Sequence, residues 1–535
     1  MGLFYNADMA MGTRKDQEQQ EEMWIPQAAL TKGASHPFYQ RLNQLLEESR
    51  FDEFVEGRCQ QFYAEKRGRP SLAPGVYFRL LLIGYFEGID SERGIAWRAN
   101  DSLALRRFLR VGLDEMPPDH STISRTRRLL DEETHREVFT WVLGVLAEKG
   151  LLKGQTLGID ATTLEANAAL RTIVRRDTGE GYQEFLQRLA QESGIKTPTR
   201  EQLARLDRRR AHKGSNEDWE HPHDPDARIT KMKDGRTHLA HKVEHAVDFS
   251  SGAVVAVTLQ AADAGDTATV CETVCEAGEQ IATVAGEEKG AEVNPEGPKE
   301  VVLDKGYHSN DVLAELADWQ VRSYCSEPDR GRRRWEGKKA EQAAVYANRR
   351  RIRGERGKRL LRQRGEKLER SFAHCYETGG MRRVHLRHHP NILKRLLVHL
   401  AAFNLGLVMR QLLGRGTPRG LQGCAVALFS TLLRLLHEVR ASPLAWKEYV
   451  DSLEPLPAPG SLPELSNNAL LTTAKRPVST TGCQPSGRGG LWLSSGIVRL
   501  RFLKGLRAAI IPEALTNPTG GRTMALIRFI RRWKA

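Results

Sequence analysis

Two short apolar segments, far apart along the chain, each end on an aspartate. Residues 156–161 read TLGIDA and residues 300–304 read EVVLD, so Asp160 and Asp304 each close a run that is typical of a buried strand. Such strands need neighbours, which constrains this part of the chain to a fold built around a sheet. If the two strands lie side by side, their carboxylates meet at one end of that sheet.

The segments that follow the first strand predict an α/β domain. Residues 237–248 and 253–260 are β-prone and are separated by a Ser-Ser-Gly turn, which predicts a hairpin. Residues 266–284 and 312–318 have helical patterns, and residues 321–325 form another short strand. The order strand, hairpin, helix, strand, helix, strand is typical of a mixed α/β fold.

Two carboxylates in such close contact repel each other, so the pair Asp160 and Asp304 is stable where a divalent cation neutralises it. Oxygen ligands favour Mg²⁺ or Mn²⁺. A third acid is predicted on a helix over residues 358–376, where Glu369 borders an apolar stripe and Glu366, one turn earlier, is the alternative. Two metal ions about 4 Å apart would activate a water or a 3′-hydroxyl and stabilise the leaving oxygen.

Upstream of this domain, residues 51–150 have helical patterns. The last short helix, over residues 122–130, carries Arg125, Arg127 and Arg128. Three short helices that end in an arginine-bearing one predict a helix-turn-helix-like unit in which these arginines contact DNA. The alternative is a plain helical bundle with a solvated basic face.

The charge of the chain favours a polyanionic partner. The 535 residues include 81 Lys and Arg against 67 Asp and Glu, a net charge of +14. Residues 326–370 alone hold 17 basic and 7 acidic residues beside the candidate active-site helix, which favours nucleic-acid contact over a merely solvated run. Further candidate contacts to phosphate or bases are Lys242, Lys305, Tyr307, Arg362, Arg364, Arg382 and Arg383.

The sequence favours neither a zinc site nor a membrane-spanning helix. His238, His241 and His245 lie in one predicted strand, but strand alternation puts His238 on the opposite face from the other two, which argues against a zinc site. The 7 cysteines include no pair with zinc-knuckle spacing, which fits a reducing cytoplasm. The apolar run over residues 396–409, at about 14 residues, is too short to span a bilayer and predicts a buried helix.

From residue 51 to 414 the sequence resembles the bacterial insertion-sequence transposases of the DDE type. The motifs that carry the resemblance are PPDHSTISRTRRLL, GIDATTLEANA, DARITKMKDGRTHLAHKVEHAVD, VVLDKGYHS and KLERSFAHCYETGGMRRVHLR. The resemblance implies an RNase H-like fold in which Asp160, Asp304 and Glu369 are the catalytic residues and bind two Mg²⁺ or Mn²⁺ ions. It also implies cleavage at terminal inverted repeats and transfer of the 3′-ends into target DNA, by a homodimer on DNA at the nucleoid.

The sequence departs from this family around the glutamate. Related transposases often have Tyr-x2-Arg-x3-Glu-x6-Lys, but here Arg362, Gly365 and Tyr376 stand at the Tyr, Arg and Lys positions of that pattern around Glu369. Two alternatives therefore stay open. One is a non-catalytic DNA-binding protein derived from a decayed transposase, and the other is a nuclease without strand transfer.

The predicted organisation is an all-α helix-turn-helix-like domain followed by an α/β, RNase H-like catalytic domain with a basic, mainly helical insertion. The expected boundaries are a loosely ordered N-terminus over 1–40, a helical DNA-binding domain over 41–150, a catalytic domain over 151–414 with a charged insertion at 165–235 and a basic insertion at 326–358, a helical segment over 415–453, and a linker and basic tail over 454–535.

Overall fold

In a computed structural model, the chain forms a helical region followed by a region built on a mixed sheet. The structure describes residues 36–64, 71–112, 114–210, 214–232, 235–286, 292–329, 331 and 333–421. The expected N-terminal segment lies almost wholly outside the described residues. So do the expected helical segment over 415–453, apart from its first residues, and the tail over 454–535.

The N-terminal region is entirely helical in the described residues, as predicted. Its helices are α2 (Pro37–Glu48), α3 (Phe51–Cys59), α4 (Pro74–Glu87), α5 (Glu92–Asp101), α6 (Leu103–Leu109), α7 (His120–Leu129) and α8 (Glu132–Glu148). Helix α4 has a proline in its first turn and ends at Gly88, whose φ of 69° suits a residue without a side chain. Almost every residue of α4 is buried, so this helix forms the centre of the domain.

The second region is built on a mixed sheet, which confirms the α/β prediction. Its strands are β1 (Thr156–Glu165), β4 (Arg228–Lys231), β5 (Thr237–Asp248), β6 (Val254–Ala261), β7 (Glu300–Leu303) and β8 (Arg322–Cys325). The strand order is β4-β5-β1-β7-β8, and β6 also pairs with β5. The pairs of β5 with β1, β4 and β6 are antiparallel, whereas β1, β7 and β8 run parallel. Strands β5 and β6 form the predicted hairpin.

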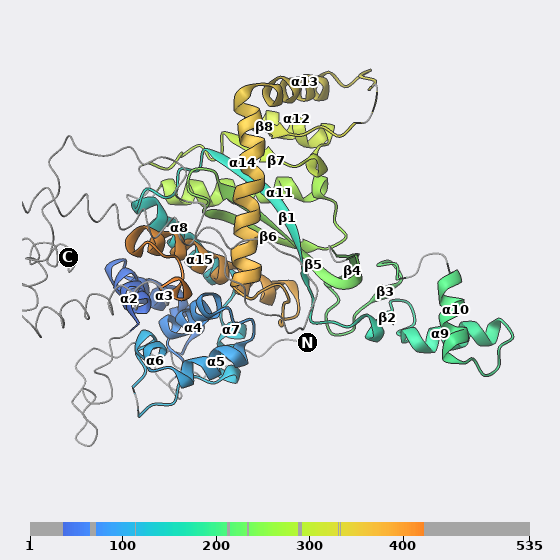
Figure 1. The fold of residues 1–535 in the computed structure, drawn as a ribbon, viewed down its shortest axis with the longest axis horizontal. Coiled ribbons are helices and arrows are strands. Elements are labelled where there is room, and N and C mark those ends of the chain that lie inside the picture. The colour runs from blue at the N-terminus through green and yellow to red at the C-terminus, as the bar shows by residue number, and fades with distance from the viewer. Residues whose placement is uncertain are drawn as a thin grey trace, which may run out of the picture. The chain divides into compact units, whose positions relative to one another are not determined.

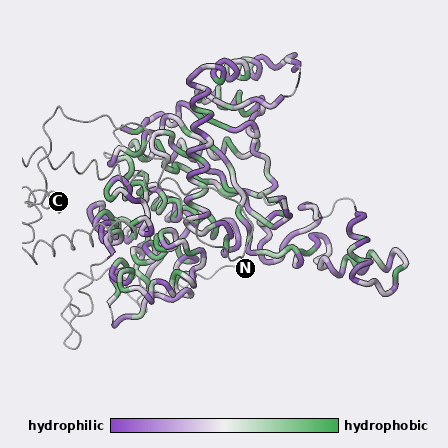
Figure 2. The backbone as a smooth tube through the Cα atoms, viewed as in Figure 1, coloured by the Kyte–Doolittle hydropathy of each residue, from purple (hydrophilic) through white to green (hydrophobic). Residues whose placement is uncertain are grey.

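Helices cover both faces of this sheet (Figure 1). They are α11 (Asp266–Ala285), α12 (Asn310–Asp318), α13 (Lys339–Arg353), α14 (Glu355–Phe372) and α15 (His389–Leu413). Helix α14 crosses the strands closely, because a Cβ at Gly158 in β1 would lie 3.2 Å from Leu368 of α14. In Figure 2, α13 and α14 are mostly hydrophilic, as their basic sequence requires.

Helix α15 joins the two regions, since it packs against α4 and α8 as well as β6. It is long and apolar enough to cross a membrane, but 89% of its apolar window is buried inside the structure. This burial is typical of a core helix, and it agrees with the buried helix predicted for residues 396–409.

The charged insertion after β1 has a small core of its own. It contains β2 (Val174–Arg175), α9 (Tyr182–Glu192), α10 (Arg200–Arg209) and β3 (Trp219–Glu220). Trp219 is 1% exposed and contacts the ring of Phe185, within a hydrophobic cluster that is separate from the main core. The few apolar residues of this charged segment therefore suffice for a folded subdomain, which the sequence did not predict.

Candidate active site

The two strand-end aspartates lie at the same end of neighbouring strands. Gly158 of β1 pairs with Val302 of β7 in parallel register, and Asp160 and Asp304 each follow two residues later. Both carboxylates contact one side chain of α14: the Arg364 guanidinium lies 3.0 Å from Asp160 Oδ2 and 3.5 Å from Asp304 Oδ1. Two acids that are far apart in the sequence therefore share one cation.

The carboxylates of Asp160 and Asp304 are partly exposed, and Arg364 is the cation that both of them contact. Burial raises the pKa of Asp160, and the charge of Asp304 raises it further, whereas Arg364 and the Ala161 amide lower it. The side chains of Asp160 and Asp304 are 28% and 47% exposed, so ligands from solvent reach them. A hollow lined by Asp304 and Lys305 opens beside Asp304.

Neither candidate for the third acid contacts this pair in the described residues. Three residues of α14 contact the sheet and so define the side of the helix that faces it: Arg364, Leu368 and Ser371. The hydroxyl of Ser371 lies 3.4 Å from Nδ1 of His245 in β5. At about 100° per residue, Glu369 points about 130° away from the centre of that side and Glu366 about 170° away. Both side chains are exposed. Glu369 is thus closer to the sheet-facing side, but its role stays a prediction.

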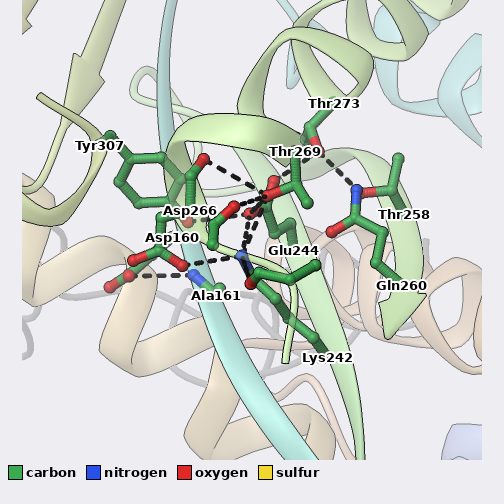
Figure 3. A network of polar contacts seen from close by, with 12 residues as sticks. Asp160, Ala161, Lys242, Glu244, Thr258, Gln260, Asp266, Thr269, Thr273 and Tyr307 are labelled. Carbon is green, nitrogen blue, oxygen red and sulfur yellow. Dashed lines mark hydrogen bonds and ion pairs between the residues drawn. The ribbon is translucent and has the colours of Figure 1, made fainter. Parts of the chain in front are cut away.

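Lys242, predicted to face DNA, is buried instead. Its side chain is 5% exposed, and Nζ lies 3.1 Å from Glu244 Oε1 and 2.7 Å from Asp266 Oδ1 (Figure 3). Nζ also donates a hydrogen bond to the hydroxyl of Thr269 in α11. The prediction was wrong because β5 is covered on both faces, so its cation is neutralised inside the protein.

Tyr307, predicted to stack on a base, is also an internal residue. It is 1% exposed, and its hydroxyl donates a 3.3 Å hydrogen bond to Glu244. It closes a short turn that follows Asp304, and a Cβ at Gly306 in this turn would lie 2.8 Å from Asp266 Oδ2. The DKGY motif therefore anchors Asp304 to the buried network of Lys242, Glu244, Asp266, Thr269, Thr273 and Tyr307, which we call the α11-side network.

Arg127, also predicted to contact DNA, is largely buried and paired inside the protein, although it also contributes to the lining of the basic groove described below. It is 6% exposed, its Nε lies 2.8 Å from Glu92 Oε1, and it donates a hydrogen bond to Asn391 of α15. Its position four residues after the buried Ile123 places it on the inner side of α7. Arg125 and Arg128, by contrast, are exposed on the same helix.

The other predicted basic contacts differ in availability. Lys305 and Arg362 are exposed. Arg382 is paired with Glu377, and Arg383 lies 3.9 Å from Glu165 at the end of β1. Arg364 contacts the carboxylate pair rather than solvent. Among the basic residues predicted to contact DNA, four are therefore exposed and make no ion pair in the described part of the chain: Arg125, Arg128, Lys305 and Arg362.

The structure contains a basic groove that the sequence did not predict. It lies between α7, the loop before β4 and the first turn of α15, and its lining includes Arg128, His223, His385 and Arg387. No acidic residue of the described chain lines it. The sequence signal was the run LRHHP at residues 386–390, whose meaning depends on segments that are distant in sequence.

Comparison with known families gives two matches. Residues 26–129 match the family described as Transposase domain (DUF772), and residues 212–405 match the family described as Transposase DDE domain. The chain belongs to the DDE transposases. The second match includes Asp304, Arg364 and Glu369 of this transposase but begins after Asp160. Comparison with curated proteins and with solved structures gives no match.

Proposed function

We propose that this transposase cleaves DNA at the ends of its element and transfers the 3′-ends into target DNA, with divalent cations as cofactors. The observation that carries the proposal is the convergence of Asp160 and Asp304 on one cationic group at the ends of parallel strands. The proposal includes an RNase H-like fold, which is supported by an antiparallel β6-β5-β1 sheet continued by parallel β7 and β8.

The donor set fits Mg²⁺ or Mn²⁺. Two carboxylates that are open to solvent suit a hard cation that keeps several waters and substrate oxygens as ligands. Asp160 and Asp304 would hold it, with Glu369 as the proposed third ligand. Two bound cations would lower the pKa of the attacking water or 3′-hydroxyl and stabilise the leaving oxygen.

Arg364 has a defined part in this proposal. Its guanidinium neutralises Asp160 and Asp304 before a cation binds, and it carries five donors that suit a phosphate as well as a carboxylate. With a cation held by Asp160 and Asp304, the Arg364 guanidinium would be free to contact a phosphate of the substrate. Arg364 would thus take over the phosphate contact that the family pattern gives to another arginine.

We place part of the DNA path along the basic groove. Arg128 and Arg387 line it, and Arg125 is exposed on the same helix α7. We propose that α7 binds the terminal inverted repeats in a helix-turn-helix-like manner, and that the protein acts as a homodimer on DNA at the nucleoid in the cytoplasm. Each phosphate contact that is removed, as in Arg128→Ala or Arg387→Ala, lowers the slope of log K against log salt by about 1.

Mg²⁺-dependent nicking tests the proposal. The substrate is DNA that carries the inverted repeats flanking the coding region, with Asp160→Asn and Asp304→Asn as test variants. Asp329→Asn is the matched control, because Asp329 lines the hollow beside Asp304 without contacting Arg364. The proposal predicts that the first two variants lose nicking and the control keeps it. If both test variants cut as well as the wild type, the catalytic assignment is wrong.

The same assay decides the third acid and the remaining alternative. Glu369→Gln is expected to abolish nicking, whereas Glu366→Gln keeps it. The outward direction of Glu369 and the salt bridges of Arg364 favour one second function, a non-catalytic DNA-binding protein. That function predicts repeat-specific binding by the wild type and no nicking with either Mg²⁺ or Mn²⁺.

A further inference from the structure

A second cluster of potential metal ligands lies away from the aspartate pair. It gathers Asp224 and Asp226 from the loop before β4, and His388, the residue before α15. One ligand atom from each of these three residues lies within 4.8 Å of the other two. His241 of β5 joins them, since its Nε2 lies 3.3 Å from Asp224 Oδ2. Three segments that are distant in sequence therefore converge here.

Capping of α15 explains only part of this cluster. Asp224 Oδ1 accepts a hydrogen bond from the backbone N–H of His388, and Asp226 Oδ2 accepts one from that of His389. These two bonds satisfy donors at the start of the helix. They do not involve Asp224 Oδ2 or His241 Nε2, which are both buried and have no hydrogen-bond partner besides each other, at 3.3 Å.

The spacing of these two atoms is that of neighbouring ligands on one metal ion. Asp224 and His241 are both 0% exposed, so water does not solvate them. With zinc–ligand distances of about 2.0–2.1 Å, adjacent ligand atoms of a tetrahedral site are about 3.3 Å apart. The observed 3.3 Å between His241 Nε2 and Asp224 Oδ2 fits this value.

The surroundings of His241 also fit a metal ligand. Its Nδ1 lies 3.1 Å from Nε2 of His389. If Nε2 of His241 binds a metal, its Nδ1 carries the proton and donates to His389, the arrangement that fixes the ring of metal-binding histidines. The two imidazole nitrogens and the two carboxylates offered here suit Zn²⁺ better than a purely oxygen-seeking cation.

We propose that Asp224, Asp226, His241 and His388 bind one structural Zn²⁺ ion. This ion ties the loop that leaves the charged insertion to strand β5 and to the start of α15, beside the basic groove. The three histidines of β5 do not form a zinc site by themselves, whereas the proposed ligands come from three segments. The proposal does not depend on the aspartate pair or on DNA cleavage.

Zinc binding by the full chain tests this site. The protein is stripped with EDTA, titrated with ZnCl₂, and assayed for bound zinc by atomic emission and for its melting temperature. Asp226→Asn and His388→Gln are the test variants, because both side chains are partly exposed and their replacement leaves the core intact. His223→Gln, an exposed histidine of the same loop, and Asp304→Asn, at the aspartate pair, are the controls.

The expected result is one Zn²⁺ per chain and a higher melting temperature in the wild type and in both controls. Both test variants should bind zinc at least about tenfold more weakly and lose the rise in melting temperature. Three outcomes overturn the proposal: no zinc retained by the wild type, equal binding by all variants, or loss of zinc in Asp304→Asn alone. The first outcome would leave Asp224 and His241 as a buried ion pair only.

Discussion

The sheet of this transposase carries carboxylate–cation groups on both faces, and they differ in how completely they are neutralised. On the α14 side, Asp160 and Asp304 share Arg364 and are 28% and 47% exposed. On the α11 side, Glu244 is 0% exposed and is bonded to Lys242, to two threonines and to Tyr307. Carboxylates that are fully satisfied inside the protein hold the fold, whereas incompletely neutralised ones at a strand end are available to a metal ion.

The largest expected effect concerns the α11-side network. Lys242→Met removes its cation and leaves Glu244 buried without a counter-charge, so the free energy of unfolding should fall by about 3–5 kcal/mol. Urea denaturation measures this change. Lys305→Met, in the exposed turn nearby, is the control and should change stability by less than about 0.5 kcal/mol. Equal small effects of the two substitutions would remove the distinction between the two faces.

Replacement of Arg364, the cation on the α14 side of the sheet, should lower the free energy of unfolding far less. Arg364→Gln is expected to lower the free energy of unfolding by about 1 kcal/mol, because its partners are partly solvated. Its main effect is on pH dependence. Arg364 lowers the pKa of Asp160 against the raising effect of burial, so its loss raises that pKa further. Since metal binding needs the ionised carboxylate, Mn²⁺ binding should then be lost at a higher pH as the solution is acidified.

This pH effect is read from Mn²⁺ titrations across the acid range, in wild type and Arg364→Gln. The midpoint is the pH at which half of the Mn²⁺ binding is lost. If this midpoint is unchanged or lower in Arg364→Gln, Arg364 does not control the charge of Asp160. Arg364→Lys, which keeps one positive charge, is the matched variant and should give an intermediate midpoint.

A smaller effect on stability is expected at Tyr307, which connects the turn after Asp304 to the α11-side network. Tyr307→Phe removes the hydrogen bond to Glu244, which should cost about 1 kcal/mol of stability. Because Tyr307 closes the turn that holds Asp304, nicking should also slow while the KM for DNA stays the same. Tyr346→Phe, at an exposed tyrosine, is the control. A change in the KM for DNA without a change in the nicking rate would restore a DNA-contact role for Tyr307.

Local patterns sufficed to predict the strands, the helical N-terminal region and the neighbouring aspartates. An apolar run that ends on an acid is a local signal, and the parallel pairing of β1 with β7 then brings Asp160 and Asp304 together. Lys242 was misassigned because exposure is a tertiary property. Strand β5 is buried over most of its length, but His241, Lys242, Glu244 and His245 interrupt its apolar pattern, so the sequence does not signal that both of its faces are covered.

The positions of Arg127 and Glu369 on their helices depend on different signals. Arg127 follows Ile123 by one turn and so faces inward, which helical periodicity predicts once Ile123 is recognised as buried. Glu369 borders the apolar stripe in sequence, but the rotation of α14 about its axis brings Leu368 and Arg364 against β1 instead. This rotation depends on a contact between segments about 200 residues apart, which periodicity does not reveal.

Iron-directed cleavage of the polypeptide tests the central claim most directly, namely that Asp160 and Asp304 hold one divalent cation between them. Fe²⁺ bound in place of Mg²⁺, with ascorbate and peroxide, cuts the chain beside its ligands. The account predicts cuts near both residue 160 and residue 304 in the full-length protein, suppressed by excess Mg²⁺ and both lost in Asp304→Asn. Cuts near neither residue, or a cut at one that survives loss of the other carboxylate, would contradict it.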